Sequence, residues 1–179
     1  MNLKDIIRTV PDFPIKGIQF RDITSLLEHP EAFNKALIDL TDSCMQFKAT
    51  KLVAIESRGF IFGSPIARDV ELPLILARKP GKLPNPTYQR NYNLEYGEAT
   101  LHIQRNSDLN KDDKIVIIDD LIATGGTAKA LASLIAQCWN VPKENILVLA
   151  VIDLPDLGGS AIIEDSGFNV KTLIEFNGE

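Results

Sequence analysis

The residues best suited to chemistry lie between positions 115 and 128. Asp119 and Asp120 follow four apolar residues there. The turn that comes next consists of Ala123, Thr124, Gly125, Gly126 and Thr127. Glycines let a backbone approach a ligand closely, and a following helix offers unpaired N–H groups and the positive end of its dipole. Threonine hydroxyls add further donors. The segment therefore predicts an anion site, and a phosphate fits it well.

The two acids indicate what the anion is attached to. Carboxylates beside a phosphate would repel it unless they face another part of the ligand. Because a carboxylate only accepts hydrogen bonds, an adjacent pair suits a cis-diol that donates two. Side chains alternate along a strand, so both acids meet one sugar only if the chain leaves strand geometry near Asp120. The segment then predicts a ribose 5-phosphate site. The alternative is a plain strand-to-helix turn with a capping threonine and solvated acids.

Length and composition indicate the kind of protein that carries this site. The chain has 179 residues, of which 45% are hydrophobic, so we expect one α/β domain spanning residues 1–179. Its net charge of -5 argues against nucleic-acid or membrane binding as the main activity. No segment approaches the roughly 20 apolar residues that span a bilayer. The two cysteines, Cys44 and Cys138, lie far apart and suit a reducing compartment, so a cytoplasmic protein is expected.

The elements that must position the site follow an alternating pattern. Apolar residues at helical spacing predict an amphipathic helix over residues 31–48. Short β-branched or apolar runs predict strands at 51–55, 72–77, 114–118, 145–152 and 170–174. Helical or loop stretches between most of these runs favour a mainly parallel sheet flanked by helices. In such sheets, ligands bind where strands end, which is where the two acids lie.

The stretch from Pro80 to Gly97 differs from the rest of the chain. It holds several glycine, proline and asparagine residues among basic and tyrosine side chains. A segment of this length without a regular pattern is expected to be a long exposed loop or a loose hairpin. Such loops in compact domains are usually functional or disordered, which suggests a flexible lid over residues 80–100.

Several motifs together resemble a known family. The segment 115–128 resembles the phosphoribosyl pyrophosphate motif of the type I phosphoribosyltransferases: four apolar residues, two acids, a short spacer and Thr-Gly-Gly-Thr. Further segments narrow the resemblance to the adenine phosphoribosyltransferases within them. These segments are 11–14 with Gly17, 20–24, 56–60, 78–84 and 94–97. They occur in that family's order and spacing, and the resemblance extends from about residue 6 to residue 176.

The resemblance implies a fold and a reaction. The fold would be that of the type I phosphoribosyltransferases, with a small N-terminal hood over about residues 1–30 and the lid described above. The reaction would convert adenine and phosphoribosyl pyrophosphate to AMP and pyrophosphate in purine salvage. The cofactor would be Mg²⁺, held mainly through the substrate and by no direct metal ligands of the chain. A homodimer is also implied, because part of a basic cluster serves the neighbouring subunit's site in that family.

The resemblance also implies roles for single residues. Pyrophosphate would be bound by Ser57, Arg58 and Gly59, and by the basic cluster, which comprises Arg78, Lys79 and Lys82. Arg58 would also assist catalysis by stabilising the departing pyrophosphate. Glu95 would be the catalytic acid/base that takes a proton from adenine once the lid closes. The base would lie against Phe20, Arg21 and Leu154.

Two alternatives remain open at this point. The same scaffold could take another purine base, namely hypoxanthine, guanine or xanthine. Alternatively, the chain could be a regulator that senses phosphoribosyl pyrophosphate and binds DNA. The sequence shows neither an appended helix-turn-helix module nor a basic face, and it retains both Glu95 and Arg58. These features favour an enzyme over a regulator.

Overall fold

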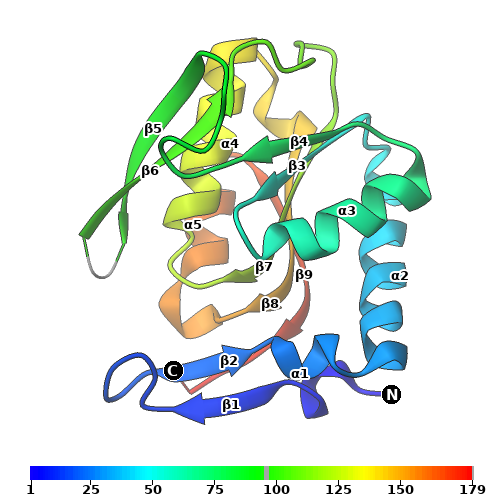
Figure 1. Cartoon of the computed structure of the whole chain (residues 1–179), viewed down its shortest axis with the longest axis vertical. Helices are drawn as coiled ribbons and strands as arrows, with labels where there is room; N and C mark the ends of the chain where they lie inside the picture. The colour runs from blue at the N-terminus through cyan, green and yellow to red at the C-terminus, as the bar shows by residue number, and fades with distance from the viewer. Residues whose placement is uncertain (95–96, 179) are drawn as a thin grey trace.

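The computed structural model describes residues 1–94 and 97–178. Its largest sheet has five strands in the order β4-β3-β7-β8-β9 (Figure 1). They are β3 (Lys51–Ile55), β4 (Leu74–Ala77), β7 (Ile115–Ile122), β8 (Ile146–Asp153) and β9 (Asn169–Glu175). Each neighbouring pair is parallel. This arrangement confirms the expected α/β class with a parallel central sheet.

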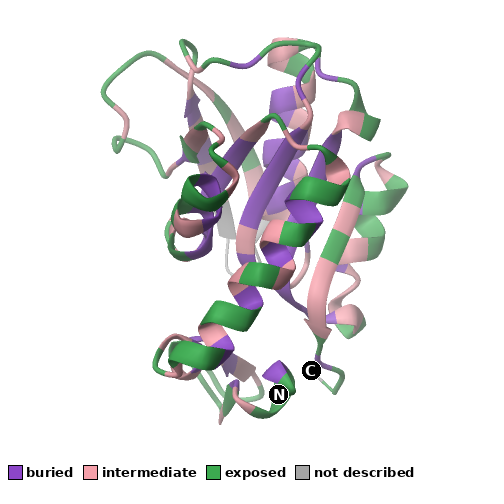
Figure 2. Cartoon of the chain, turned by 90° about the vertical axis from the view of Figure 1, so that its right-hand side faces the viewer, coloured by how far each residue is buried: buried purple, intermediate pink, exposed green. Residues whose placement is uncertain are grey.

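Helices cover both faces of this sheet. One face packs against α2 (Pro30–Phe47) and α3 (Gly59–Val70), and the other against α4 (Gly126–Trp139) and α5 (Gly159–Asp165). Two apolar cores result, one on each side of the sheet. Figure 2 shows the central strands buried and the helices exposed on their outer sides. Strands β7 and β8 are almost entirely buried, which explains why residues 115–118 and 146–152 are unbroken apolar runs.

One predicted boundary is wrong in an informative way. The apolar run predicted a strand ending at residue 118, before the two acids, but β7 continues to Ile122. Its pairing with β8 continues through Asp119 opposite Ala150 and Ile122 opposite Asp153. The hydrogen-bonded strand therefore includes Asp119 and Asp120, which the apolar run did not predict to be part of it. The helix predicted over 31–48 is shifted by one residue and spans Pro30–Phe47.

The N-terminal region forms a separate small layer. It contains η1 (Leu3–Asp5), the antiparallel strands β1 (Arg8–Pro11) and β2 (Gln19–Asp22), and α1 (Thr24–Leu27). In Figure 1 this hairpin crosses below the sheet, beside the C-terminal end of the described chain. The guanidinium of Arg21 lies 4.5 Å from the ring centre of Phe176, directly after β9. The hood thus sits at the carboxyl edge of the sheet.

The segment expected to be a loop or loose hairpin belongs to a regular hairpin. Strand β5 (Thr87–Leu94) pairs with β6 (Gly97–Gln104) from Thr87 opposite Gln104 to Leu94 opposite Gly97. The hairpin packs along α4, where the rings of Tyr88 and Trp139 meet edge to face at 5.1 Å. The remaining short helices are η2 (Lys143–Asn145) and η3 (Pro155–Leu157). Within the described residues, no helix combines the length and apolar character needed to cross a bilayer.

Candidate active site

A pocket of about 250 Å³ opens at the carboxyl edge of the central sheet. Its lining comes from the turn after β3, the end of β7, the start of α4, and one residue of β5. The lining residues are Ile55, Glu56, Ser57, Arg58, Tyr92 and the continuous run 119–128. The structure therefore brings together the two acids, the small-residue turn and the Ser57-Arg58 turn, which lie about 60 residues apart in the sequence.

Both acids reach this one pocket because the strand is irregular where they lie. Up to Ile118 the side chains of β7 alternate between the two cores, and Ile118 belongs to the core beneath α2 and α3. Three residues later, Leu121 packs on that same core, so the alternation has slipped by one position. At the slip, the backbone N–H of Asp120 donates a 2.9 Å hydrogen bond to Oδ1 of Asp119. The departure from strand geometry expected near Asp120 is present, although the strand itself continues.

The electrostatics of the acid pair depend on Arg58. Its Nε lies 3.0 Å from Oδ2 of Asp120, whose residue is only 2% exposed. The two groups form an ion pair, and within the described chain no hydrogen bond reaches that oxygen. Burial, and then the neighbouring charge of Asp120, raises the pKa of Asp119 well above its usual range. Burial also raises the pKa of Asp120, while Arg58 opposes that shift. A ligand that donates hydrogen bonds to both carboxylates would stabilise their charged forms.

The small-residue turn is shaped by a close approach of two backbone segments. Gly125 has φ +75° and precedes the first turn of α4 as its N-cap. A Cβ at Gly125 would lie 2.5 Å from the carbonyl oxygen of Gly159, the first residue of α5. Only glycine fits this conformation and this contact. Among the described residues, no side chain caps α4, so its first N–H groups remain available to an anion.

The turn after β3 presents the residues expected to bind pyrophosphate. Ser57 is exposed, Arg58 is the N-cap of α3, and Gly59 is the first residue of that helix. A Cβ at Gly59 would lie 2.5 Å from the carbonyl oxygen of Ile118, so this glycine packs directly on β7. In the basic cluster, Lys79 and Lys82 are exposed and Arg78 is half-buried.

The residues predicted to bind the base lie on β2 of the hood and directly after β8, and Glu95 lies outside the described residues. The ring of Phe20 lies 5.8 Å from the guanidinium carbon of Arg58, so the hood borders the turn after β3. Arg21 is 8% exposed, and its Nη1 donates to the Thr9 hydroxyl at 2.6 Å. Leu154 is buried directly after β8, and its N–H donates to the carbonyl of Ile122 at 3.0 Å.

Several residues at the site were not among those predicted from the sequence, and Tyr92, Glu56 and Gly159 are examples. Tyr92 lines the pocket from β5, where it is half-buried. Glu56 lines the pocket beside Ser57, and Gly159 packs against the turn from a separate helix. The Gly-Gly pair at 158 and 159 was the only local signal for the last of these. No sequence pattern connected Tyr92 with the acids, because that contact depends on how the hairpin packs.

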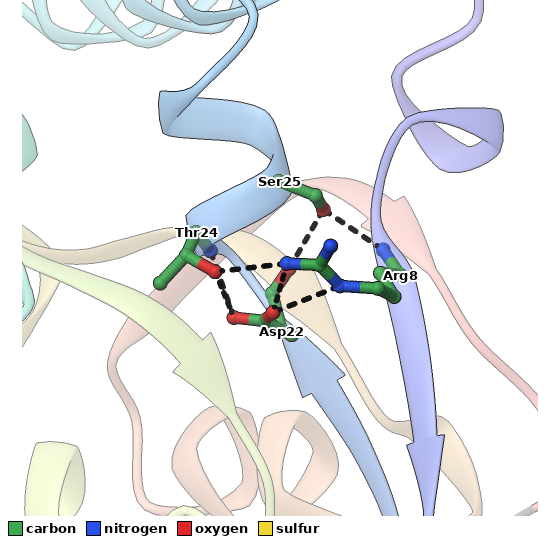
Figure 3. A network of polar contacts seen from close by, with 4 residues as sticks. All are labelled: Arg8, Asp22, Thr24 and Ser25. Carbon is green, nitrogen blue, oxygen red and sulfur yellow. Dashed lines mark hydrogen bonds and ion pairs between the residues drawn. The ribbon is translucent and has the colours of Figure 1, made fainter.

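A polar network fixes the hood immediately beyond Arg21 (Figure 3). Arg8 donates to Oδ2 of Asp22 through Nε at 3.1 Å and Nη2 at 2.7 Å. The Thr24 hydroxyl and N–H donate to Oδ1 of Asp22 at 2.6 and 3.0 Å. Ser25 accepts from the Arg8 N–H and donates to the Asp22 carbonyl, both at 2.9 Å. The network ties β1, β2 and α1 into one unit that carries the predicted base-binding residues.

Replacing Asp22 with asparagine is expected to lower the melting temperature at pH 7 by about 2–4 °C. The hydrogen bonds from Thr24 and Arg8 lower the pKa of Asp22 below 3.8, outweighing its partial burial. A lowered pKa in the folded state stabilises the protein above the unfolded-state value, and that stabilisation is lost as pH falls through the folded-state value. The difference between wild type and variant should therefore shrink towards pH 3. Urea unfolding of both proteins at pH 7 and pH 3 tests this, and an undiminished difference at pH 3 contradicts it.

The site offers oxygen ligands but no complete metal cluster. Within the described part of the chain, no group of three or more His, Cys, Asp or Glu side chains is placed to hold a metal ion. Mg²⁺ usually takes one or two protein carboxylates together with substrate phosphates and water. Asp119 and Asp120 are carboxylates of this kind at the pocket wall. The oxygen donors at the pocket wall therefore fit an Mg²⁺ ion that enters with an anionic substrate and is held mainly by that substrate.

Comparison with known proteins agrees with this geometry. Residues 22–139 match the family model described as the phosphoribosyl transferase domain. The adenine phosphoribosyltransferase of Haemophilus ducreyi is 49% identical over 177 residues, covering 98% of this chain and 96% of that protein. The matched family segment includes both acids, the small-residue turn and the basic cluster.

Solved structures resemble the chain over almost its full length. The crystal structure of adenine phosphoribosyltransferase from Thermoanaerobacter pseudethanolicus superposes with a TM-score of 0.86 at 37% identity, covering 98% of this chain and all of that one. The enzyme from Giardia lamblia, solved in complex with 9-deazaadenine, gives a TM-score of 0.90 at 32% identity, with 98% of both chains covered. The resemblance thus includes the hood and hairpin as well as the central sheet.

Proposed function

The chain belongs to the adenine phosphoribosyltransferase family, and from this premise we propose that its carboxyl-edge pocket binds the ribose 5-phosphate part of phosphoribosyl pyrophosphate. It is a pentosyltransferase of purine salvage with the type I phosphoribosyltransferase fold, and it converts adenine and phosphoribosyl pyrophosphate to AMP and pyrophosphate. The observation that carries the proposal is the convergence of both acids and the 123–127 turn on one pocket.

The proposed roles follow from the geometry of that pocket. The run Ala123, Thr124, Gly125, Gly126 and Thr127 binds the 5-phosphate with the open N-terminus of α4, and Asp119 and Asp120 accept hydrogen bonds from the ribose hydroxyls. As the bond from C1′ to the leaving oxygen stretches, the sugar becomes cation-like and the departing pyrophosphate gains charge. Arg58 stabilises this charge, with Ser57, Gly59 and the basic cluster. Mg²⁺, held through the substrate, supplies further charge neutralisation when bound.

Adenine is placed against the hood in this proposal. Phe20 and Arg21 lie on β2 and Leu154 follows β8, so the base would lie between the hood and the sheet edge. Support comes from the Giardia lamblia relative, whose structure contains the adenine analogue 9-deazaadenine. Glu95 takes the proton that adenine releases, a role inferred from its place in the Leu-Glu-Tyr-Gly motif of residues 94–97. Closure of a lid over residues 80–100 would exclude water from the reacting sugar.

We also propose that the chain forms a homodimer and acts in the cytoplasm. Residues 1–179 are proposed to form a single domain. The dimer is supported by apolar side chains that are exposed in the described chain, among them Ile61 of α3 at 38% and Leu76 of the edge strand β4 at 37%. The cytoplasm is supported by Cys44 and Cys138, which are both unpaired and suit a reducing compartment. No role in nucleic-acid or membrane binding is proposed.

The function is tested by measuring AMP formation from labelled adenine and phosphoribosyl pyrophosphate, with and without Mg²⁺. We expect turnover that requires the metal and that unlabelled adenine suppresses. Unlabelled hypoxanthine, guanine and xanthine in the same assay serve as competitors. Stronger suppression by one of these than by adenine would contradict the choice of base. Absence of product together with a DNA gel shift would replace the enzyme with a regulator.

A further inference from the structure

We infer that Glu56 is a positioning residue for pyrophosphate binding, whose carboxylate holds the basic cluster against the wall of the phosphate pocket. Glu56 directly follows β3 and itself lines the pocket next to Ser57 and Arg58. The inference rests on the proposed function, because it concerns how that same site meets pyrophosphate. It assigns Arg78 an indirect role, in which this arginine acts by ordering the lysines of the cluster.

The contacts of the Glu56 carboxylate carry this assignment. Oε2 accepts from Nε of Arg78 at 3.3 Å and from the backbone N–H of Lys79 at 2.8 Å, and Oε1 accepts from Nη2 of Arg78 at 3.2 Å. The side chain of Glu56 is 13% exposed and that of Arg78 is 29% exposed. A forked arginine contact of this kind fixes direction as well as distance. Both oxygens are therefore engaged within the chain.

The Arg78 guanidinium also contacts residues other than Glu56. Its Nη1 donates to the carbonyl of Lys82 at 3.1 Å, and its carbon lies 5.9 Å from the ring centre of Phe60. One arginine thus connects Glu56 to both ends of the basic cluster. Lys79 and Lys82 are the exposed members, and their ammonium groups are the ones left to meet a ligand. Without Glu56, the segment 78–82 would lose the bonds that Arg78 and Lys79 make to the Glu56 carboxylate.

Arg78 also anchors the base of the β5–β6 hairpin. The N–H of Arg78 donates to the carbonyl of His102 at 2.9 Å, and the N–H of His102 donates back at 2.8 Å. The N–H of Glu56 also donates to the carbonyl of Ala77 at 2.9 Å. The turn after β3, the basic cluster and strand β6 are consequently joined through Arg78, with Glu56 at the pocket end of the chain of contacts.

A carboxylate in the wall of an anion pocket needs compensation, and Glu56 has it. Partial burial acts to raise its pKa, but the Lys79 N–H and Arg78 prevail, so the pKa of Glu56 is lowered. The carboxylate is charged at neutral pH, and the cations that it holds offset its repulsion of phosphate. A glutamine at this position would remove the charge that attracts Arg78 while preserving size. This makes Glu56→Gln the appropriate variant.

The test compares the affinities for phosphoribosyl pyrophosphate, which carries a pyrophosphate group, and for AMP, which does not. We expect Glu56→Gln to weaken phosphoribosyl pyrophosphate binding about tenfold, the effect of losing one charged hydrogen bond, by calorimetry with Mg²⁺. Its affinity for AMP, which lacks pyrophosphate, should stay within about twofold of wild type. In steady-state kinetics, the KM for phosphoribosyl pyrophosphate should rise more than kcat falls. The double variant Glu56→Gln with Arg78→Gln should be no weaker than Arg78→Gln alone, because the two residues act as a unit.

Asp108→Asn is the matched control. Asp108 pairs with Lys51 at 2.5 Å, at the opposite end of β3, and its loss should change neither affinity. Unchanged phosphoribosyl pyrophosphate affinity in Glu56→Gln, or an equal loss for AMP, overturns the inference. If Glu56→Gln does not fold, Arg78→Gln alone must show the same selective loss, and its failure to do so is also decisive. A wild-type chain that binds neither ligand would instead overturn the proposed function.

Discussion

Replacing Gly125 with alanine is expected to weaken AMP binding by at least about 100-fold. The added Cβ would lie 2.5 Å from the carbonyl oxygen of Gly159 and 2.9 Å from its Cα, and both are backbone atoms that cannot rotate away. The turn must shift, which moves its N–H groups away from the phosphate. Each hydrogen bond to a charged group contributes about 1.5–3 kcal/mol, and about 1.4 kcal/mol is tenfold in affinity. Loss of two such bonds accounts for the expected effect.

Gly158→Ala is the control for this experiment. Gly158 has φ +72° and Gly125 has φ +75°, so alanine is strained equally at both positions. A Cβ at Gly158, however, meets no described heavy atom within 4 Å. Calorimetry with AMP should show near wild-type affinity for Gly158→Ala, and circular dichroism should show both variants folded. Equal affinity of the two alanine variants would mean that the close contact does not shape the phosphate turn.

Replacing Glu95 with glutamine is expected to lower kcat by about 10²–10⁴, the usual contribution of general acid–base catalysis. Glutamine has the same size but cannot accept the proton that adenine releases. The proposed contacts of residues 119–127 with the 5-phosphate and ribose do not involve Glu95, so the affinity for phosphoribosyl pyrophosphate should be retained. Single-turnover measurement of AMP formation, with calorimetry of the donor, separates the two effects.

An exposed acid on α5, Glu164, provides the comparison for that variant. Glu164→Gln carries the same chemical change at a distance from the pocket lining and should turn over at the wild-type rate. If Glu95→Gln does likewise, Glu95 has no part in proton transfer. If it instead loses donor affinity with kcat intact, its role is in binding.

The central architecture could be predicted because burial on both faces leaves a direct mark on the sequence. The runs at 115–118 and 146–152 have no polar residue to face water, and they became the middle strands β7 and β8. The end of β7 was missed for the opposite reason. Asp119 and Asp120 belong to the strand, but the hydrophobic pattern stops at their charge.

The local phosphate signal was equally visible in the sequence, whereas contacts between distant segments were not. The acid pair and the 123–127 turn are contiguous, and the structure places them in one pocket. The ion pair of Arg58 with Asp120, and that of Arg78 with Glu56, joins residues at the ends of different strands. Which residues pair in this way depends on the order of β4, β3 and β7 in the sheet, and no local sequence pattern specifies that order.

The packing of Gly125 on Gly159 makes the phosphate turn and the start of α5 interdependent parts. A designer who transplants only residues 119–127 into another α/β scaffold would leave the turn without the backbone surface that shapes it. Moving the beginning of α5 together with the turn would preserve the contact between Gly125 and Gly159. For the same reason, enlarging either glycine forces a displacement of the other, since a Cβ at Gly159 would lie 2.2 Å from the carbonyl oxygen of Ala123.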